Sequence, residues 1–301
     1  MLTVIRTAAL IVGLFFTVGY LYQVFYVLVG LLKTPKTYEE TKKYKYGVLI
    51  SARNESAVIA QLIQSIKQQN YPKKLITVFV VADNCTDHTA EIARQAGAVV
   101  YERFNKEQVG KGYALDWLLK NIAKDYGEDA FDGYFVFDAD NILDENYVAE
   151  MNKVFGSGYR VITSYRNSKN YGDNWISAGY ALWFLREAKY INNARMMLGT
   201  SCAVSGTGFL VSREVFEKNG GWKHHLLTED IEFSTDCIVQ GERIGYCNSA
   251  IIYDEQPTTF KASWNQRLRW SKGFYQVFFN YGGKLCKNIF KKHSFAAYDM
   301  F

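Results

Sequence analysis

Alternating strand-like and helix-like segments in the first half of the chain constrain its fold most. Apolar runs typical of buried strands lie at residues 46–51, 75–82 and 98–101, and amphipathic helical patterns separate them. A strand, helix, strand, helix order is typical of βαβ units, which build a parallel sheet. Ligands of such sheets bind outside the carboxyl ends of the strands. We therefore expect an α/β fold with a mostly parallel central sheet and a binding site at one edge.

Polar side chains follow several of these strands. Asn54 and Glu55 come after the first strand, and Asp83 ends the second. Asp138 and Asp140 follow a further apolar run, Tyr-Phe-Val-Phe. In an extended chain, side chains at i and i+2 point the same way, so both carboxylates can converge on one small space. A divalent cation or a solvated turn would neutralise them, and the pattern alone fits a metal site and an Asp-rich turn equally well.

A glycine-flanked lysine precedes a predicted helix. Gly110 and Gly112 allow a ligand to approach the backbone, and Lys111 at a helix N-terminus favours an anion such as a diphosphate. An ordinary glycine loop before a helix is the alternative. The chain lacks G-x-x-x-x-G-K-[ST] and lacks G-x-G-x-x-G after a strand, which argues against a P-loop nucleotidase and a dinucleotide-dependent dehydrogenase.

Two further motifs occur later in the chain. The segment Thr228-Glu229-Asp230 is expected to begin a helix, with Thr228 as its N-cap. Carboxylates there could simply stabilise the helix end. The segment S-G-T-G at 205–208 could line a pocket with backbone or turn into a strand. The four histidines have neither metal-like nor catalytic spacing.

An uncharged stretch at residues 7–32 predicts a transmembrane helix. A helix of about 26 residues, with a rise of about 1.5 Å per residue, is longer than the roughly 30 Å thickness of the hydrocarbon layer. A cleaved signal peptide is the alternative, but a small-residue cleavage site is missing. Arg6 alone precedes the stretch, whereas several lysines follow it. The positive-inside rule then predicts a cell-membrane protein with one N-terminal span and a cytoplasmic catalytic domain.

The segment at 258–279 combines aromatic residues with lysines and arginines. This composition is typical of an amphipathic helix at a membrane interface, in contact with membrane lipids, although a solvated basic face is an alternative. The net charge of +5 is modest, so a nucleic-acid partner is not expected. Five scattered cysteines suit a reducing compartment and argue against a disulfide framework or a zinc site.

Four regions follow from these patterns. We expect a transmembrane helix at 1–33, a basic juxtamembrane linker at 34–45, a catalytic domain at 46–257 and an interfacial helix with a C-terminal segment at 258–301.

Seven motifs of the chain are A-R-N-E, V-A-D-N-C-T-D, G-K-G, F-D-A-D, S-G-T-G, T-E-D and Q-R-L-R-W. In this order, they resemble the motifs of the processive, membrane-embedded glycosyltransferases of family 2. That group contains the cellulose, chitin, hyaluronan and poly-N-acetylglucosamine synthases. The resemblance spans about residues 48–273. It implies a GT-A fold and a UDP-sugar donor, with UDP-GlcNAc or UDP-Glc as the expected donors.

The resemblance also implies roles on the donor side. Asn54, Glu55 and Asp83 would hold the uridine, and Lys111 would contact the diphosphate. Asp138 and Asp140 would bind ribose or diphosphate through Mg²⁺ or Mn²⁺.

On the acceptor side, the resemblance implies that Asp230 is the general base. Gln266, Arg269 and Trp270 would close over the diphosphate and the acceptor end, and Trp270 offers a flat face for a pyranose. The expected reaction is a single, inverting, metal-dependent displacement that extends a polysaccharide.

Two departures from the family pattern leave alternatives. S-G-T-G replaces the usual acceptor-side sequence, and the chain stops at Phe301, where processive members continue into further transmembrane helices. We expect a truncated chain, or else an enzyme with one span that cannot export a polymer. The competing functions are transfer of one sugar to a lipid-linked acceptor and a catalytically silent nucleotide-sugar-binding subunit.

Overall fold

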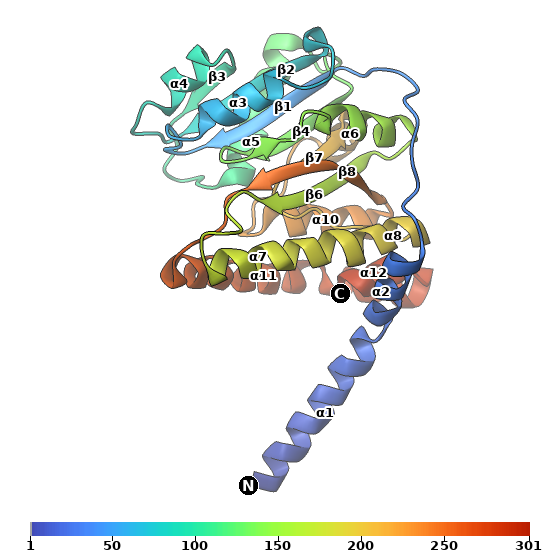
Figure 1. Ribbon diagram of the computed structural model, residues 1–301. Coiled ribbons are helices and arrows are strands. Elements are labelled where there is room, and N and C mark those ends of the chain that lie inside the picture. Colours follow the sequence, from blue (N-terminus) through green and yellow to red (C-terminus); the bar gives the residue numbers. More distant parts are fainter. Residues whose placement is uncertain (1) are drawn as a thin grey trace.

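A single eight-stranded mixed sheet forms the centre of the molecule, with helices on both faces and a further helical layer at one end (Figure 1). The computed structural model describes residues 2–301. The strands, in the order β3-β2-β1-β4-β7-β6-β8-β5 across the sheet, are β3 Val99–Arg103, β2 Ile76–Asp83, β1 Tyr46–Ala52, β4 Gly133–Asp138, β7 Phe209–Ser212, β6 Val161–Ser168, β8 Ile244–Asp254 and β5 Ile142–Leu143.

Parallel pairing dominates this sheet. β1 pairs in parallel with β2 and β4, β2 with β3, and β6 with β8. The antiparallel exceptions are β7, which lies between β4 and β6, and the short β5 beside β8. The predicted α/β fold with a mostly parallel sheet is confirmed.

Two hydrophobic cores cover the two faces of the sheet, because alternate residues of each strand point to opposite sides. Val48 and Ile50 of β1 belong to the core that includes α3 and α6, whereas Leu49 belongs to the core that includes α5 and α10. The helices of this region are α3 Ile59–Lys67, α4 Thr89–Gln95, α5 Lys111–Tyr126, α6 Tyr147–Gly156, α9 Arg213–Asn219 and α10 Glu229–Gln240, with a 3₁₀ turn η1 at Lys73–Leu75.

A helical layer lies at one end of the sheet (Figure 1). Helix α7 (Trp175–Arg186) continues through a π-helical segment η2 (Glu187–Asn192) into α8 (Asn193–Leu198). Helix α11 (Phe260–Lys292) runs beside α7, and α12 (Phe295–Met300) follows it. Large apolar side chains on α7 and α11 are exposed. They are Trp175, Leu182, Trp183, Leu185, Phe260, Trp264, Leu268, Phe274, Tyr275, Phe278, Phe279 and Phe290.

The N-terminal helix is long and apolar enough to cross a membrane: 31 residues, Leu2–Leu32, with a mean hydropathy of 1.9. It is divided at Leu21 into α1 (Leu2–Tyr20) and α2 (Tyr22–Leu32). No residue of α1 is buried, and α1 projects away from the body (Figure 1). Helix α2 instead packs Tyr26 against the η2–α8 segment. The predicted span at 7–32 therefore has two environments, and α1 alone measures about 28 Å, close to the hydrocarbon thickness.

Candidate active site

The parallel strands carry the predicted donor-side residues to one edge of the sheet. In the paired registers, Ser51 lies opposite Asp138, and Ala52 lies opposite Ala82. The loops after β1, β2 and β4 therefore leave the sheet side by side. Asn54, Glu55, Asp83, Asp138 and Asp140 all lie in or next to these loops, as the sequence pattern predicts.

Side-chain hydrogen bonds join the first two of these loops. Asn54 has a left-handed backbone conformation (φ 59°), and its Oδ1 accepts a hydrogen bond from the Thr86 N–H at 2.8 Å. The Glu55 N–H donates to Thr89 Oγ1 at 2.8 Å. His88 is the N-cap residue of α4. The carboxylate of Asp87, one residue earlier, accepts a hydrogen bond from the Thr89 N–H at 3.1 Å. The Asn54 Oδ1 atom thus ties the loop after β1 to the loop after β2.

Asp83 is buried and forms an ion pair. Its Oδ1 lies 2.6 Å from Arg103 Nη1 and also accepts a hydrogen bond from Asn84 Nδ2 at 3.1 Å. Arg103 is the residue opposite Asp83 in the β2–β3 register. Its guanidinium also donates to the Gln108 carbonyl at 2.8 Å, which anchors the loop that precedes Lys111. Sequence reasoning missed Arg103, because only the register places it beside Asp83.

Lys111 connects four of the sequence motifs. Its Nζ lies 2.5 Å from Asp138 Oδ1, 2.8 Å from the Gly206 carbonyl oxygen and 3.9 Å from Glu229 Oε1. Burial alone would lower the pKa of Lys111, but the carboxylates of Asp138 and Glu229 outweigh it and raise the pKa. The ammonium is therefore charged, and it neutralises the end of β4.

Glu229 was not singled out from the sequence, although it belongs to the T-E-D motif. Burial raises its pKa to about 7, while Lys111 opposes that change. Its carboxylate forms part of the acidic surroundings of Lys111, together with Asp138.

Asp140 lies in a second cluster of polar side chains. Burial, together with the neighbouring carboxylates of Asp254 and Asp138, raises the pKa of Asp140 to about 7. Asp254 is itself buried and accepts hydrogen bonds from Arg166 Nε at 2.8 Å and from Asn141 Nδ2 at 2.9 Å. Sequence reasoning missed Asp254 and Arg166, which lie on β8 and β6, far from Asp140 in the chain.

The donor set at Asp138 and Asp140 fits a divalent cation only in part. No group of three or more His, Cys, Asp or Glu side chains within residues 2–301 could hold a metal ion. Two carboxylates are nevertheless hard oxygen ligands of the kind that Mg²⁺ and Mn²⁺ prefer. Burial, and then the neighbouring carboxylates of Asp254 and Asp138, raise the pKa of Asp140, and a bound cation would stabilise its charged form. The residues therefore suit a cation held jointly with oxygen atoms of a substrate.

Asp230 lies in the first turn of α10, next to the S-G-T-G segment at residues 205–208, which is called the glycine loop from here on. A Cβ atom placed on Gly206 (φ 76°) would lie 3.8 Å from Asp230 Oδ2 and 3.4 Å from Arg166 Nη1. Burial raises the pKa of Asp230, although the Ile231 N–H, the Lys111 ammonium and the Gly206 N–H act against that rise. The carboxylate is thus a stronger base than an exposed aspartate.

Thr228 occupies the predicted N-cap position of α10, but its side chain makes no capping hydrogen bond, and its Oγ1 is buried without a partner among the described residues. Helix α11 packs against this side chain. Gly273 packs so closely on Thr228 that a Cβ atom at Gly273 would be 2.4 Å from the threonine Oγ1 and Cγ2 atoms.

The Q-x-x-R-W residues occupy different environments on α11. Gln266 Oε1 is buried and has no hydrogen-bond partner in the described part of the chain. Trp270 is half-buried and packs edge-on against Tyr180 of α7, with ring centroids 6.0 Å apart. Arg269 is exposed, and no ion pair or hydrogen bond of its side chain occurs within residues 2–301. The arrangement places Trp270 against α7, and it leaves Arg269 outside the cluster around Lys111.

The fold and the strand-end carboxylates define the class of protein. The chain is similar in fold to the mannosyltransferase PcManGT from Pyrobaculum calidifontis, solved with GDP-Man and Mn²⁺. The TM-score is 0.65 at 17% identity, over 88% of this chain and 72% of that chain. It is also similar to residues 1–349 of S. aureus TarS in complex with UDP, with a TM-score of 0.54 at 16% identity over 80% and 65% of the two chains. The class is that of proteins with a GT-A fold.

The family follows from the sequence comparison. The model of the family described as "Glycosyltransferase like family 2" matches residues 44–273, and the chain belongs to that family. The predicted family and enzyme class are confirmed.

Curated relatives of the chain include both glycolipid and polysaccharide synthases. They are "Probable glycosyltransferase YdaM" of Bacillus subtilis (28% identical over 79% of this chain), "Beta-monoglucosyldiacylglycerol synthase" of Synechocystis (26%, 79%) and "Poly-beta-1,6-N-acetyl-D-glucosamine synthase" of Staphylococcus aureus (24%, 76%). The matches cover 57%, 50% and 54% of these relatives, so the chain spans about half of their length.

Proposed function

We propose that this chain transfers a sugar from a UDP-sugar to an acceptor hydroxyl, with inversion at the anomeric carbon. The observation that carries the proposal is the convergence of three groups on the glycine loop. Lys111 contacts both Asp138 and the Gly206 carbonyl, and a Cβ atom placed on Gly206 would lie 3.8 Å from Asp230 Oδ2. A cationic group for a leaving diphosphate and a carboxylate base for an acceptor thus lie at one locus.

The first role is charge stabilisation on the leaving group. Breaking the bond from the sugar C1 to the phosphate oxygen leaves negative charge on the departing UDP, and preorganised cations lower the barrier to that step. Asp138 and Asp140 would hold Mg²⁺ or Mn²⁺, which supplies Lewis-acid neutralisation of the diphosphate when bound. Lys111 adds a fixed positive charge, because its pKa is raised. The mannosyltransferase of similar fold, solved with Mn²⁺, supports the use of a divalent cation.

The second role is proton removal from the acceptor. We assign it to Asp230, whose raised pKa suits a general base better than an ordinary carboxylate would. A single displacement needs no enzyme nucleophile, and it inverts the configuration of the sugar. Arg166, held by Asp254, borders the same glycine loop and carries positive charge toward this side of the site.

The remaining predicted residues complete the proposal. Asn54, Glu55 and Asp83 would surround the uridine, since their loops lie together at the sheet edge. Gln266 would contact the substrate, because its buried Oε1 lacks a protein partner within residues 2–301. Arg269 and Trp270 would close over the diphosphate and the acceptor after α11 shifts, since Trp270 packs on Tyr180 in the present conformation.

The membrane sets the location of the reaction. We place α1 across the bilayer and the catalytic domain on the cytoplasmic side, where the basic linker and UDP-sugars would both be found. The exposed apolar side chains of α7 and α11 would then rest in the interface, close to a membrane-bound acceptor.

For the acceptor, we propose the end of a growing polysaccharide, as in the poly-β-1,6-N-acetyl-D-glucosamine synthases to which the chain is similar. A lipid acceptor is the second candidate, and the similarity to β-monoglucosyldiacylglycerol synthases favours it. Sizing the product formed from radiolabelled UDP-GlcNAc and UDP-Glc in membranes separates the two. Long chains support the polymer, whereas a single-sugar lipid product supports the glycolipid.

The Asp230→Asn variant tests the catalytic assignment. It should keep UDP affinity within about twofold and lose transfer by about 10²–10⁴-fold, the range of general-base catalysis. Asp129→Asn, the same change at an exposed and distant carboxylate, should transfer at the wild-type rate. Undiminished transfer by Asp230→Asn would refute the base. Binding of UDP by the wild-type chain without transfer of any tested sugar would instead identify a silent binding subunit.

A further inference from the structure

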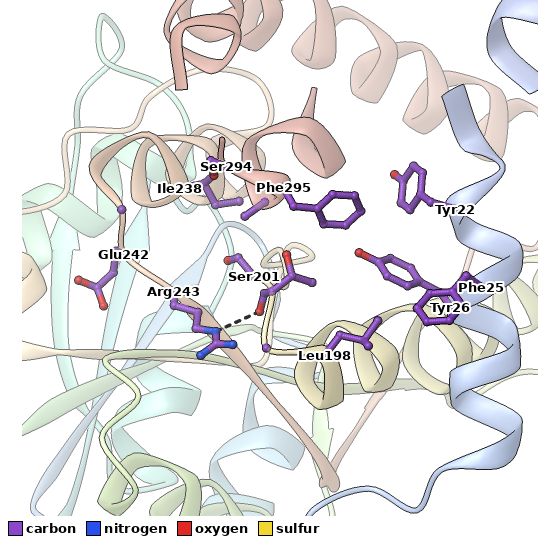
Figure 2. A pocket seen from close by; sticks show the side chains of 14 residues that line it. Tyr22, Phe25, Tyr26, Leu198, Ser201, Ile238, Glu242, Arg243, Ser294 and Phe295 are labelled. Atoms are coloured by element: carbon purple, nitrogen blue, oxygen red, sulfur yellow. Dashed lines mark hydrogen bonds between the residues drawn. The ribbon is translucent and has the colours of Figure 1, made fainter. Parts of the chain in front are cut away.

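A cavity of about 860 Å³ lies away from the candidate active site, between the membrane-proximal helix α2 and the body. Figure 2 shows its walls, which come from α2, the segment after α8, the turn after α10 and the start of α12. None of the residues assigned to sugar transfer lines it. The volume lies within the range of sites that enclose a small molecule or part of a lipid.

One wall of the cavity is aromatic and apolar. Tyr22, Phe25 and Tyr26 of α2 line it together with Leu198 and Phe295, and the rings of Tyr22 and Phe295 pack edge to face with centroids 5.5 Å apart (Figure 2). Phe25 is 54% exposed, and α2 directly continues α1, the candidate span. Aromatic side chains at the end of a span are typical of the level where lipid headgroups meet acyl chains. This wall is therefore suited to the first carbons of an acyl chain.

The opposite wall is polar, and its charged side chains form no ion pair among the described residues. Arg243 donates its Nε hydrogen to the Thr200 carbonyl at 3.2 Å, but its guanidinium forms no ion pair within residues 2–301. Thr200 Oγ1 is buried and lacks a hydrogen-bond partner among the described residues. Gly199 makes room for the arginine, since a Cβ atom there would lie 2.3 Å from Arg243 Nη2. An exposed guanidinium without an ion-pair partner is a good receptor for a phosphate.

Glu242 lines the same cavity and also lacks an ion-pair partner in the described chain. A purely anionic headgroup would be repelled by this carboxylate. A headgroup that carries an ammonium beside its phosphate complements both charges. The two neighbouring side chains, Glu242 and Arg243, therefore offer one charge of each sign to such a headgroup.

A buried ion pair holds the cavity open. The Asp299 carboxylate of α12 accepts hydrogen bonds from the hydroxyls of Tyr22 and Tyr26, both at 2.8 Å. Arg195 of α8 donates to the two oxygens of the same carboxylate, at 2.7 and 2.8 Å. These bonds fix α2, α8 and α12 relative to one another, so the site is preformed and binding costs little ordering.

We propose that this cavity binds a membrane phospholipid of the phosphatidylethanolamine type. Its phosphate contacts Arg243, its ammonium contacts Glu242, and an acyl chain lies along Phe25 and Leu198. The site couples the catalytic body to the lipid composition of the membrane, and it does not depend on the sugar donor or acceptor.

Native mass spectrometry of the full chain, released from vesicles of equal phosphatidylethanolamine and phosphatidylglycerol, tests the proposal. The wild-type chain should retain one phosphatidylethanolamine. Arg243→Gln should lower the retained fraction about tenfold, the usual effect of losing a charge-assisted hydrogen bond. Leu198→Trp should also lower it, by filling the apolar wall. Lys287→Gln, the same loss of charge at an exposed α11 lysine outside the cavity, should retain the lipid.

Several outcomes would overturn the proposal. They are full retention by Arg243→Gln, equal loss in Lys287→Gln, equal retention of phosphatidylglycerol by the wild type, and a bound inorganic phosphate without lipid. Cross-links between Phe25→Cys and Leu198→Cys of separate chains would show that a second copy fills the cavity. UDP binding by each variant reports folding independently of the lipid, so failure of sugar transfer leaves this test valid.

Discussion

Gly273 of α11 lies directly against Thr228, the residue that precedes Glu229 and Asp230. A Cβ atom at position 273 would be 2.4 Å from the Thr228 side-chain tip and 2.9 Å from its Cβ atom. The helix that carries the Q-x-x-R-W motif is therefore seated on the start of the helix that carries the proposed base. The absence of a side chain at 273 sets the distance between the two motifs.

We predict that Gly273→Ala lowers transfer by about tenfold or more. The added methyl pushes α11 away from Thr228, and displacements of about 1 Å in an active site can cost about 10² in rate. Gly283→Ala on the same helix is the matched control, since nothing lies within 4 Å of its Cβ position. That control should retain transfer and stabilise the chain by about 0.5–1 kcal/mol, the helix preference of alanine. Equal turnover in both variants would contradict the prediction.

Lys111→Met should reduce kcat/KM by about 10²–10³-fold, the cost of losing one preorganised charge at a developing anion. The variant leaves Asp138 and Glu229 without their shared cation. Lys120→Met removes an exposed ammonium from the same helix and should change kcat/KM by less than about twofold. Steady-state kinetics with the preferred UDP-sugar measure both. Wild-type kcat/KM in Lys111→Met would remove the lysine from the proposed mechanism.

The edge of the sheet at which the site lies could be predicted from the sequence. Apolar runs that end in Asn54, Asp83 and Asp138 report strands whose carboxyl ends meet, because parallel pairing follows from the helices between them. Lys111 could also be placed there as an anion-binding group. Its contact with the Gly206 carbonyl could not, because a loop conformation 95 residues further along the chain decides it.

The supporting ion pairs depend on long-range pairing that the sequence does not report. Arg103 lies opposite Asp83 in the β2–β3 register. Arg166 lies opposite Ile252 in the β6–β8 register, and its side chain reaches Asp254, two residues further along β8. Hydropathy likewise cannot separate lipid from protein as the neighbour of an apolar helix. The packing of Tyr26 on the η2–α8 segment was for that reason beyond the reach of sequence analysis.

The buried Asp83–Arg103 pair yields a prediction about stability. Arg103→Met should lower the free energy of unfolding by about 3–5 kcal/mol, because it leaves an uncompensated buried carboxylate. Arg94 pairs with Glu102, the strand neighbour of Arg103, but that pair is exposed. Arg94→Met should cost at most about 1 kcal/mol. Urea titration of the detergent-solubilised variants compares them, and similar losses would show that the Asp83 pair is not the anchor of this edge.

The proposed base predicts a particular pH dependence. Burial holds the pKa of Asp230 above the usual value of about 3.9 for an aspartate, so the acidic limb of kcat/KM should have its midpoint above that value. The limb should be missing from the residual activity of Asp230→Asn. A profile that stays flat down to pH 4 in the wild type would assign the proton transfer to another group.

The same shift in pKa predicts an effect on stability. Because the folded state binds the Asp230 proton more tightly than the unfolded state does, the stability contributed by this group falls as pH rises from the unfolded pKa to the folded one. Above the folded pKa, the cost of the buried charge is fully present. Asp230→Asn removes that cost, so it should raise Tm at pH 8 and change it much less at pH 4. Thermal unfolding of both proteins at the two pH values measures the sign of the change in Tm. A lower Tm for the variant at pH 8 would mean that Lys111 and the backbone N–H groups stabilise the carboxylate by more than its burial costs.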